Sequence, residues 1–273
     1  MCQAESAIPS TISCALQRRG NALWMRLAGL IALLALLFSP PTIAAEHYDL
    51  LPGSDLATPV YVRDSGRTGP TVLIVAAIHG DEVAGHYAAE ALRRETPARG
   101  RWIIVPTAHR RAFEAGLRTT YDMPDLNRSF PGSAHGPASA RLADALLGLV
   151  ARYRPVLVLD LHEALPVRDG VANELANSLI ISESQGTGAT GASGISAAEL
   201  ALDLSEGPPL PGGQTLTLLA GAPAGSFNRV ASERYAVPVI TVESNRGEAL
   251  SARIDYHRTI VRRLLEAIGG APR

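Results

Sequence analysis

The segment Thr71–Glu82, TVLIVAAIHGDE, decides the fold. It starts as a continuous apolar and β-branched run and ends in the polar residues His79, Asp81 and Glu82. An uninterrupted run of this kind predicts a strand that is buried on both faces of a sheet. A helical pattern follows at once over Val83–Arg94. A buried strand that leads straight into a helix is typical of a parallel sheet covered by helices.

The same alternation continues along the chain. Further strands are predicted over Arg101–Pro106, Pro155–Leu161 and Val239–Val242, and helices over Ala138–Tyr153 and Ser251–Ile268. We therefore expect an α/β fold with three layers, α-β-α, around a mixed, largely parallel sheet. In the last helix the apolar residues recur at helical spacing, so its arginines are expected to face water. These arginines are Arg253, Arg258, Arg262 and Arg263.

Two stretches interrupt this rhythm. Glu183–Gly194 and Gly207–Gly213 are rich in glycine, proline and small residues, which cannot build a core, so we predict surface loops. Loops of α/β enzymes often shape the substrate entrance, which would make these two a lid. The alternative is a tolerated insertion without a function.

Length and charge limit the possible classes of protein. The chain has 273 residues, of which 47% are hydrophobic, enough for one well-buried domain. Its 25 basic and 26 acidic residues give a formal net charge of -1. This balance provides no electrostatic footprint for nucleic acid or for an anionic bilayer. We expect no nucleic acid partner and no membrane contact beyond the N-terminal segment.

The N-terminal segment is typical of a secretory leader. Arginines precede the apolar run Leu27–Phe38, and prolines and the small residues Ala44 and Ala45 follow it. This order is that of a signal peptide, and the run is short for a transmembrane helix. We predict that residues 1–45 are a signal peptide, or alternatively an uncleaved anchor, and that 46–273 form an exported, periplasmic domain.

The end of the first strand presents two types of metal ligand. His79 and Glu82 lie three positions apart on a turn, so both side chains can project to one side, and Gly80 leaves room beside them. Imidazole and carboxylate are natural zinc ligands. Because Cys2 and Cys14 both fall in the leader, a metal site in the mature chain has to use nitrogen and oxygen. Alone the motif is weak, since acidic residues also stabilise a helix N-terminus.

Two further strands end on matching residues. The run PVLVLDLHE brings His162 to the end of one strand, and VITV is followed directly by Glu243. In an open α/β sheet, ligands bind outside the carboxyl ends of the strands. We therefore expect these two residues to meet His79 and Glu82 at one edge of the sheet.

Four sequence blocks have to be considered together. They are IHGDE (Ile78–Glu82), DLNRSFPG (Asp125–Gly132), DLHE (Asp160–Glu163) and TVES (Thr241–Ser244). In their order and spacing they resemble the succinylglutamate desuccinylase/aspartoacylase family, which is related to the zinc carboxypeptidases, and the resemblance extends over most of the mature chain. It implies a zinc carboxypeptidase-like fold and a zinc-dependent hydrolase that cleaves an amide bond next to a free carboxylate.

The resemblance also implies a role for each matching residue. It makes His79, Glu82 and His162 the ligands of one Zn²⁺, with Glu243 as the general base that takes a proton from the attacking water. Four further residues, in the second block and just before it, also receive a role. Asn127 and Arg128 bind the free carboxylate of the substrate, Arg118 steadies the scissile carbonyl, and Asp125 orients the imidazole of His79.

Other interpretations of the same residues remain open. The block around Arg128 could be a charged surface turn. A catalytic tyrosine is not identified: Tyr235 and Tyr256 are candidates by proximity, or else ordinary half-buried residues.

The leading hypothesis is thus a zinc hydrolase that acts on a small-molecule or short-peptide substrate with a free carboxylate, either an N-acyl amino acid or a cell-wall peptide. The alternative is a non-catalytic periplasmic module that binds zinc or a peptide on the same scaffold, although a pure binder would not need Glu243. A serine hydrolase is disfavoured, because the sequence lacks a Gly-x-Ser-x-Gly elbow. The oligomeric state is not predicted.

Overall fold

The computed structural model describes residues 45–183 and 194–272. The predicted leader, apart from its last residue, and most of the loop Glu183–Gly194 therefore lie outside the described residues. Among the helices that are described, none combines the length and the apolar character needed to cross a bilayer.

The centre of the molecule is an eight-stranded sheet with the order β1-β2-β4-β3-β5-β10-β8-β9. Its strands are β1 (Ala45–Leu50), β2 (Thr58–Asp64), β3 (Thr71–Ala76), β4 (Arg101–Val105), β5 (Leu157–Ala164), β8 (Ser178–Ser182), β9 (Thr217–Ala220) and β10 (Val239–Asn245). The neighbours β4-β3, β3-β5, β5-β10 and β8-β9 pair in parallel, and the other pairs are antiparallel. The expected mixed, largely parallel sheet is confirmed.

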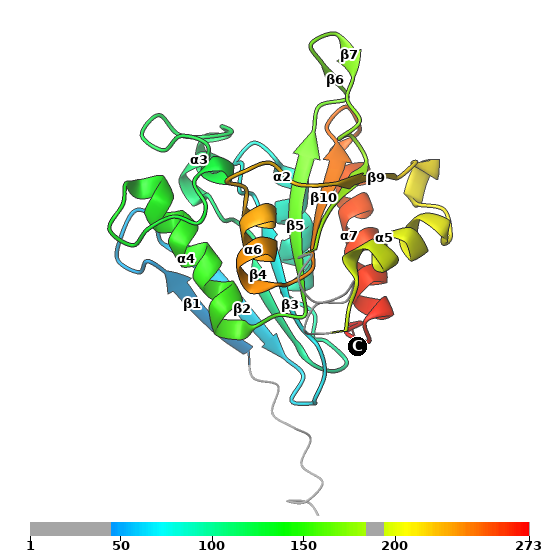
Figure 1. Ribbon diagram of the computed structural model, residues 1–273, viewed down its shortest axis with the longest axis horizontal. Coiled ribbons are helices and arrows are strands. Elements are labelled where there is room, and N and C mark those ends of the chain that lie inside the picture. The colour runs from blue at the N-terminus through cyan, green and yellow to red at the C-terminus, as the bar shows by residue number, and fades with distance from the viewer. Residues whose placement is uncertain (1–44, 184–193, 273) are drawn as a thin grey trace, which may run out of the picture. The chain divides into compact units, whose positions relative to one another are not determined.

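Helices cover both faces of this sheet (Figure 1). They are α2 (Val83–Leu92), α3 (Arg110–Ala115), α4 (Ala138–Tyr153), α5 (Ala197–Glu206), α6 (Phe227–Tyr235) and α7 (Leu250–Ala267). One core cluster joins the sheet to α4 and α6, and a second joins the opposite face to α2, α5 and α7. Successive residues of β3 alternate between the two clusters, which explains its uninterrupted apolar sequence. The three-layer prediction is confirmed.

Two of the central strands are longer than predicted. The parallel ladder between β5 and β10 continues to the pair Ala164 and Asn245. His162 and Glu243 consequently lie within hydrogen-bonded strands and not in the turns after them. Residues in a ladder are held more rigidly than residues in a loop, so these two side chains are placed by the sheet itself.

The prediction that all four arginines of α7 face water is wrong for Arg253. Its side chain is only 14% exposed, because it pairs with the carboxylate of Glu163 on β5. Arg258 and Arg262 keep 41% and 37% of their side-chain surface exposed. Helical periodicity identifies the apolar stripe of α7, but it does not show that Arg253, at the border of this stripe, contacts a residue of the sheet.

Several elements were not expected from the sequence. A short hairpin of β6 (Val167–Arg168) and β7 (Val171–Ala172) projects beyond the sheet, as Figure 1 shows at its upper end. Most residues of Gly207–Gly213, which ends in a short 3-10 turn, η2 (Pro211–Gly213), are exposed as predicted, but Leu210 is buried in the core cluster that includes α7. No residue of this stretch lines the candidate site, so the lid interpretation is not supported for it.

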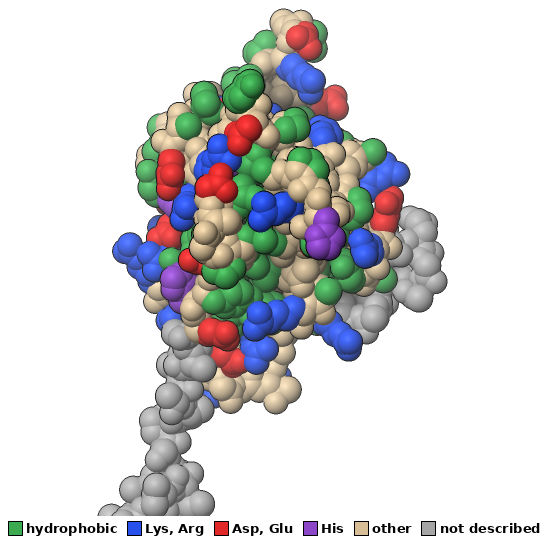
Figure 2. All heavy atoms as spheres, turned by 90° about the vertical axis from the view of Figure 1, so that its left-hand side faces the viewer, with side chains coloured by type: hydrophobic (Ala, Val, Ile, Leu, Met, Phe, Trp, Pro, Cys, Tyr) green, Lys and Arg blue, Asp and Glu red, His purple; other side chains and the backbone are tan. Residues whose placement is uncertain are grey.

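Acidic and basic side chains lie interspersed on the face shown in Figure 2, with apolar side chains between them. No extended patch of one sign gathers on this face. A surface of this kind produces no long-range field that would steer a highly charged polymer toward it.

Candidate metal centre and its cavity

The turn after β3 places two of the predicted ligands. Gly80 lies between them, and a Cβ atom there would come within 2.1 Å of the backbone of Ala112 on α3. Only glycine therefore allows the turn to pack this closely against α3. The amide of Glu82 donates to the carbonyl of His79 at 3.3 Å, which closes the turn and brings both side chains to the same side.

The sheet register places the other two predicted residues. Glu243 on β10 stands directly opposite His162 on β5, and two residues earlier Thr241 stands opposite Asp160. Because side chains alternate along a strand, all four lie on one face of the strand pair. We call this the front face. The structure thus brings together the ends of three strands, as the sequence predicted.

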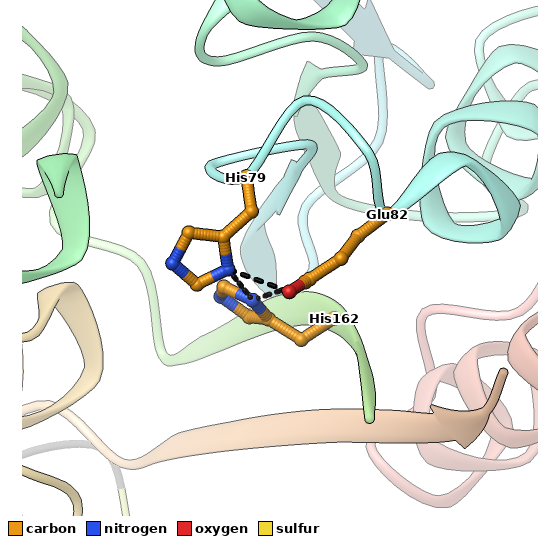
Figure 3. Close-up of side chains that lie close together, drawn as sticks. All are labelled: His79, Glu82 and His162. Atoms are coloured by element: carbon orange, nitrogen blue, oxygen red, sulfur yellow. Dashed lines mark hydrogen bonds and ion pairs between the residues drawn. The ribbon is translucent and has the colours of Figure 1, made fainter. Parts of the chain in front are cut away.

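Three donor groups converge at this point (Figure 3). The Glu82 carboxylate lies 2.7 Å from Nδ1 of His79 through one oxygen and 2.7 Å from Nδ1 of His162 through the other. One ligand atom from each of the three residues falls within 4.8 Å of the others, and all three side chains are buried. Two imidazoles and a carboxylate that meet in this way fit a tetrahedral metal ion with one open position.

The electrostatics of these groups favour a positive charge between them. Burial alone would raise the pKa of Glu82, but His162 and His79 outweigh it and hold that pKa well below its usual range. Burial alone would lower the pKa of His162, yet the carboxylates of Asp160 and Glu82 raise it well above its usual value. A buried site that stabilises an extra proton in this way would also stabilise a divalent cation.

Each imidazole has a carboxylate on its far side. Asp125 lies 3.2 Å from Nε2 of His79, and Asp160 lies 3.1 Å from Nε2 of His162. The contact of Asp125 is a hydrogen bond and that of Asp160 is an ion pair, and carboxylate partners of this kind orient metal-binding histidines. The resemblance suggested Asp125, whereas Asp160 was missed. Its position two residues before His162, on the same face of the strand, is the signal that could have identified it.

Arg118 lies at the edge of the centre. Its guanidinium donates to Glu82 at 3.1 Å and to Asp125 at 3.3 Å, and about half of its side chain, 48%, is exposed. It therefore connects a candidate ligand with the carboxylate behind His79. The exposed half faces the cavity in front of the three donors.

Asn127 and Arg128 belong to a short 3-10 helix, η1 (Leu126–Arg128). The side-chain carbonyl of Asn127 accepts from the amide of Phe227 at 2.9 Å, which anchors it to the start of α6. The guanidinium of Arg128 is exposed and lines the same cavity. The sequence pattern did not indicate α6, so the contact between Asn127 and Phe227 could not be predicted.

A cavity of about 760 Å³ opens in front of the three donors. Charged side chains form one part of its wall, and Leu165, Leu175, Leu219 and Ile180 contribute an apolar part. This volume lies in the range of sites for small molecules and short peptides.

Glu243 borders this cavity and keeps part of its surface exposed. Burial of the rest raises its pKa to about 8, and the nearby Glu82 and Asp160 add to the increase. A nearby metal cation would counteract both effects and favour the carboxylate. Glu243 is thus a carboxyl group whose charge depends on the state of the centre.

The two tyrosine candidates lie elsewhere. Tyr256 belongs to α7 and its side chain is completely buried in the core, and Tyr235 ends α6, near Pro238. Neither is among the described residues that line the cavity. The interpretation as structural residues therefore holds.

The chain is similar to several known proteins. Residues 68–177 match the model of the succinylglutamate desuccinylase/aspartoacylase catalytic domain. Over 108 residues the chain is 41% identical to an N-alpha-acetyl-L-2,4-diaminobutyric acid deacetylase from Halomonas elongata. This match covers 38% of the chain and 31% of the deacetylase, so it spans about a third of that relative.

Solved structures extend the similarity over most of the chain. An aspartoacylase family protein from Mesorhizobium loti is 27% identical, with a TM-score of 0.59 over 85% of this chain and 69% of its own. The ectoine utilization protein EutE (DoeB) from Ruegeria pomeroyi, bound to product, is 24% identical, with a TM-score of 0.62 over 84% and 68%. The cell shape determinant protein Csd4 from Helicobacter pylori is 18% identical, with a TM-score of 0.64 over 84% and 56%. The last two show the shared fold.

Proposed function

We propose, on the premise that this chain belongs to the succinylglutamate desuccinylase/aspartoacylase family, that it is a zinc-dependent hydrolase of amide bonds next to a free carboxylate. One observation supports this above all others. A partly exposed carboxyl group, Glu243, faces the cavity directly beside a buried His-Glu-His cluster. A site that only binds metal has no need of such a group.

His79, Glu82 and His162 would hold the ion. The donor set of two imidazoles and one carboxylate, without sulfur, suits zinc in a catalytic site. When bound, zinc would polarise the scissile carbonyl and lower the pKa of water near it. Asp125 and Asp160 would keep the two imidazoles in the tautomer that presents Nδ1 to the ion.

Glu243 would act as the general base. As a carboxylate it can take a proton from the attacking water, and as the resulting acid it can pass this proton to the leaving nitrogen. The transfer leaves the amine as a good leaving group when the C–N bond breaks. The rigid β5–β10 ladder supports this role, because it fixes the carboxyl group relative to His162.

Asn127 and Arg128 would bind the free carboxylate of the substrate. A guanidinium offers a planar pair of N–H donors that matches a carboxylate, and the exposed side chain of Arg128 can turn to it from the cavity wall. Arg118 would stabilise the negative charge that develops on the scissile carbonyl oxygen, since its exposed half borders the three donors.

For the substrate we favour an N-acyl amino acid. The relative from Halomonas elongata carries the name of an N-acetyl amino acid deacetylase, and the part of the chain that matches the family includes His79, Glu82 and His162. The apolar part of the cavity wall would accept the carbon skeleton on the other side of the amide. A short peptide with a free carboxylate is the other possible substrate.

A direct test combines metal analysis with a substrate screen. The purified chain should contain about one zinc per molecule, and His162→Ala should lose it. A panel of N-acetyl and N-succinyl amino acids should then be compared with short peptides, including peptides with D-amino acids and diaminopimelate. Zinc binding without turnover of any compound would favour the non-catalytic binding module instead.

The location of the protein is part of this proposal. We propose that residues 1–45 direct export to the periplasm, because arginines, an apolar run and small residues follow one another there. Cell fractionation of the full-length chain tests this. A product that stays in the cytoplasm at full mass would contradict it.

A further inference from the structure

The back face of the β5–β10 pair carries polar residues where the rest of the layer is apolar. On this face Leu161 and Val242 belong to the core cluster that packs under α7. The next residues on the same face are Glu163 and Ser244, which stand opposite each other in the ladder. Both are buried.

Two residues of α7 bind this pair. Arg253 forms an ion pair with the Glu163 carboxylate, and Nε2 of His257 lies 3.1 Å from the Ser244 hydroxyl. Arg253 and His257 are four positions apart, so they lie one above the other on the same side of the helix. We call these four residues the clasp. Figure 1 shows α7 running beside β10, which agrees with this contact.

The clasp joins directly to the candidate centre. Each strand residue of the clasp immediately follows a front-face residue, His162 in one strand and Glu243 in the other. The Glu163 carboxylate accepts from the amide of Ala84 at 2.5 Å, which fastens the first turn of α2. The backbone amide of Glu163 donates to the Glu82 carboxylate at 3.1 Å. Glu163 thus connects the strand that carries His162 with the turn that carries Glu82.

Stability alone is a poor reason for this arrangement. The Glu163 side chain is 0% exposed, and taking a carboxylate and a guanidinium out of water costs free energy that their attraction does not reliably repay. Apolar residues of similar size would fill this part of the core at least as well. Charged groups do provide directional contacts, which fix one arrangement of the strands and the helix.

We propose that the clasp positions the metal ligands and the general base from behind, so that α7 sets the geometry of the front face. The inference rests on the proposed function and assigns Glu163, Ser244, Arg253 and His257 as positioning residues. None of them needs to touch the substrate. Their effect reaches the site through the backbone of β5 and β10 and through the start of α2.

The decisive variant is the double substitution Glu163→Gln with Arg253→Met. It removes both charges together, and the amide oxygen of the new side chain can still accept from Ala84. We expect the thermal midpoint to stay within about 5 °C of the wild type. We also expect zinc affinity, measured by competition with a chromogenic chelator, to fall about 10- to 100-fold. With saturating zinc, kcat should fall about 10-fold while KM changes little.

A matched control exists on the same helix. Arg262 pairs with Glu95 at 2.5 Å and is nine positions beyond Arg253, away from the front face. The double substitution Glu95→Gln with Arg262→Met removes one positive charge from α7 together with its negative partner. Its zinc affinity and kcat should equal those of the wild type. Equal losses in both double variants would mean that any disturbance of α7 affects the centre, which would overturn the specific role of the clasp.

A smaller change covers the case in which the first variant does not fold. Ser244→Ala removes only the hydroxyl that His257 contacts, and we expect a loss of zinc affinity of about 3- to 10-fold. Native zinc affinity in every folded clasp variant would overturn the proposal while leaving the proposed hydrolase intact. A wild-type chain that binds no zinc would contradict the proposed function, and the clasp with it.

Discussion

The front and back faces of the β5–β10 pair follow opposite rules within one ladder. The front face, with His162 and Glu243, borders a cavity, and the charges around these two residues shift their pKa values. The back face, with Glu163 and Ser244, buries polar groups completely and pairs each with a residue of α7. The difference indicates that the chemistry is performed on one face and the geometry is maintained on the other.

This difference between the two faces predicts that substitutions on one face affect other properties than substitutions on the other. A substitution at Glu243, the partly exposed residue of the front face, should affect the reaction more than the fold. A back-face substitution should affect the fold as soon as it leaves one partner of a buried pair alone.

The largest effect is expected at Glu243. Glu243→Gln keeps the size of the side chain but removes the proton acceptor, so kcat should fall about 10²- to 10⁴-fold. The zinc content should stay the same, because the substitution leaves all three metal donors in place. Metal analysis and steady-state kinetics on one preparation check both statements. Turnover at the wild-type rate would remove Glu243 from the mechanism.

Next in size is the single substitution Arg253→Met on the back face. It leaves the buried Glu163 carboxylate without its cation, and the free energy of unfolding should fall by about 3–5 kcal/mol. Adding Glu163→Gln should recover most of this loss, because no uncompensated charge remains. Urea unfolding monitored by circular dichroism measures both variants. An unfolding free energy unchanged in the single variant would show that the pair is not effectively buried.

The sequence allowed the front face to be predicted but not the back face. A polar residue directly after a buried apolar run is local information, and strand ends of a parallel sheet meet at one edge, so His79, His162 and Glu243 could be assigned together. Arg253 was assigned to the solvent because a helical pattern records only its own helix. Its contact with Glu163 depends on the packing of α7 against β5, far apart in the chain.

Elements with mixed composition were also missed. α6, FNRVASERY, has few apolar residues and buries two polar ones, Asn228 and Ser232, and its start is fixed by contacts such as the Ser226 hydroxyl that accepts from the amide of Arg229. The anchor of Asn127 on Phe227 could not be foreseen for this reason. Asp160 was overlooked for a different reason: within an apolar strand it resembled a single polar interruption, although its position two residues before His162 places both side chains on one face of β5.

A smaller effect is expected from Asp125, which supports the front face from outside the strand pair. Asp125→Asn keeps a polar group near Nε2 of His79 but removes the charge that orients the imidazole. Zinc affinity should fall about 10- to 100-fold, less than in His162→Ala, which removes a ligand. Chelator competition on both variants gives the order. If Asp125→Asn weakened zinc as much as His162→Ala, Asp125 would have to be treated as a ligand.

His109 is a buried histidine that belongs to neither face, and its effect on the pH dependence of stability can be compared with the effects of the two faces. His109 precedes α3, and its Nδ1 accepts from the amide of Ala112 at 3.4 Å, so the cap needs the neutral imidazole. Burial, with a contribution from Arg111, lowers the pKa of His109 to about 4. In the unfolded chain the pKa of histidine is about 6.5. Between these two values the unfolded state binds more protons than the folded state.

The contribution of His109 to stability is therefore complete above pH 6.5 and is lost as the pH falls toward about 4. The slope is at most about 1.4 kcal/mol per pH unit. His109→Asn keeps a favourable cap residue that does not titrate, so its unfolding free energy should decrease less over this range. Urea unfolding at pH 7, 6 and 5 compares the two chains. Equal slopes would mean that His109 titrates normally in the fold, and the acid sensitivity of the wild type would then have to come from another group, such as His257, whose pKa burial lowers to about 3.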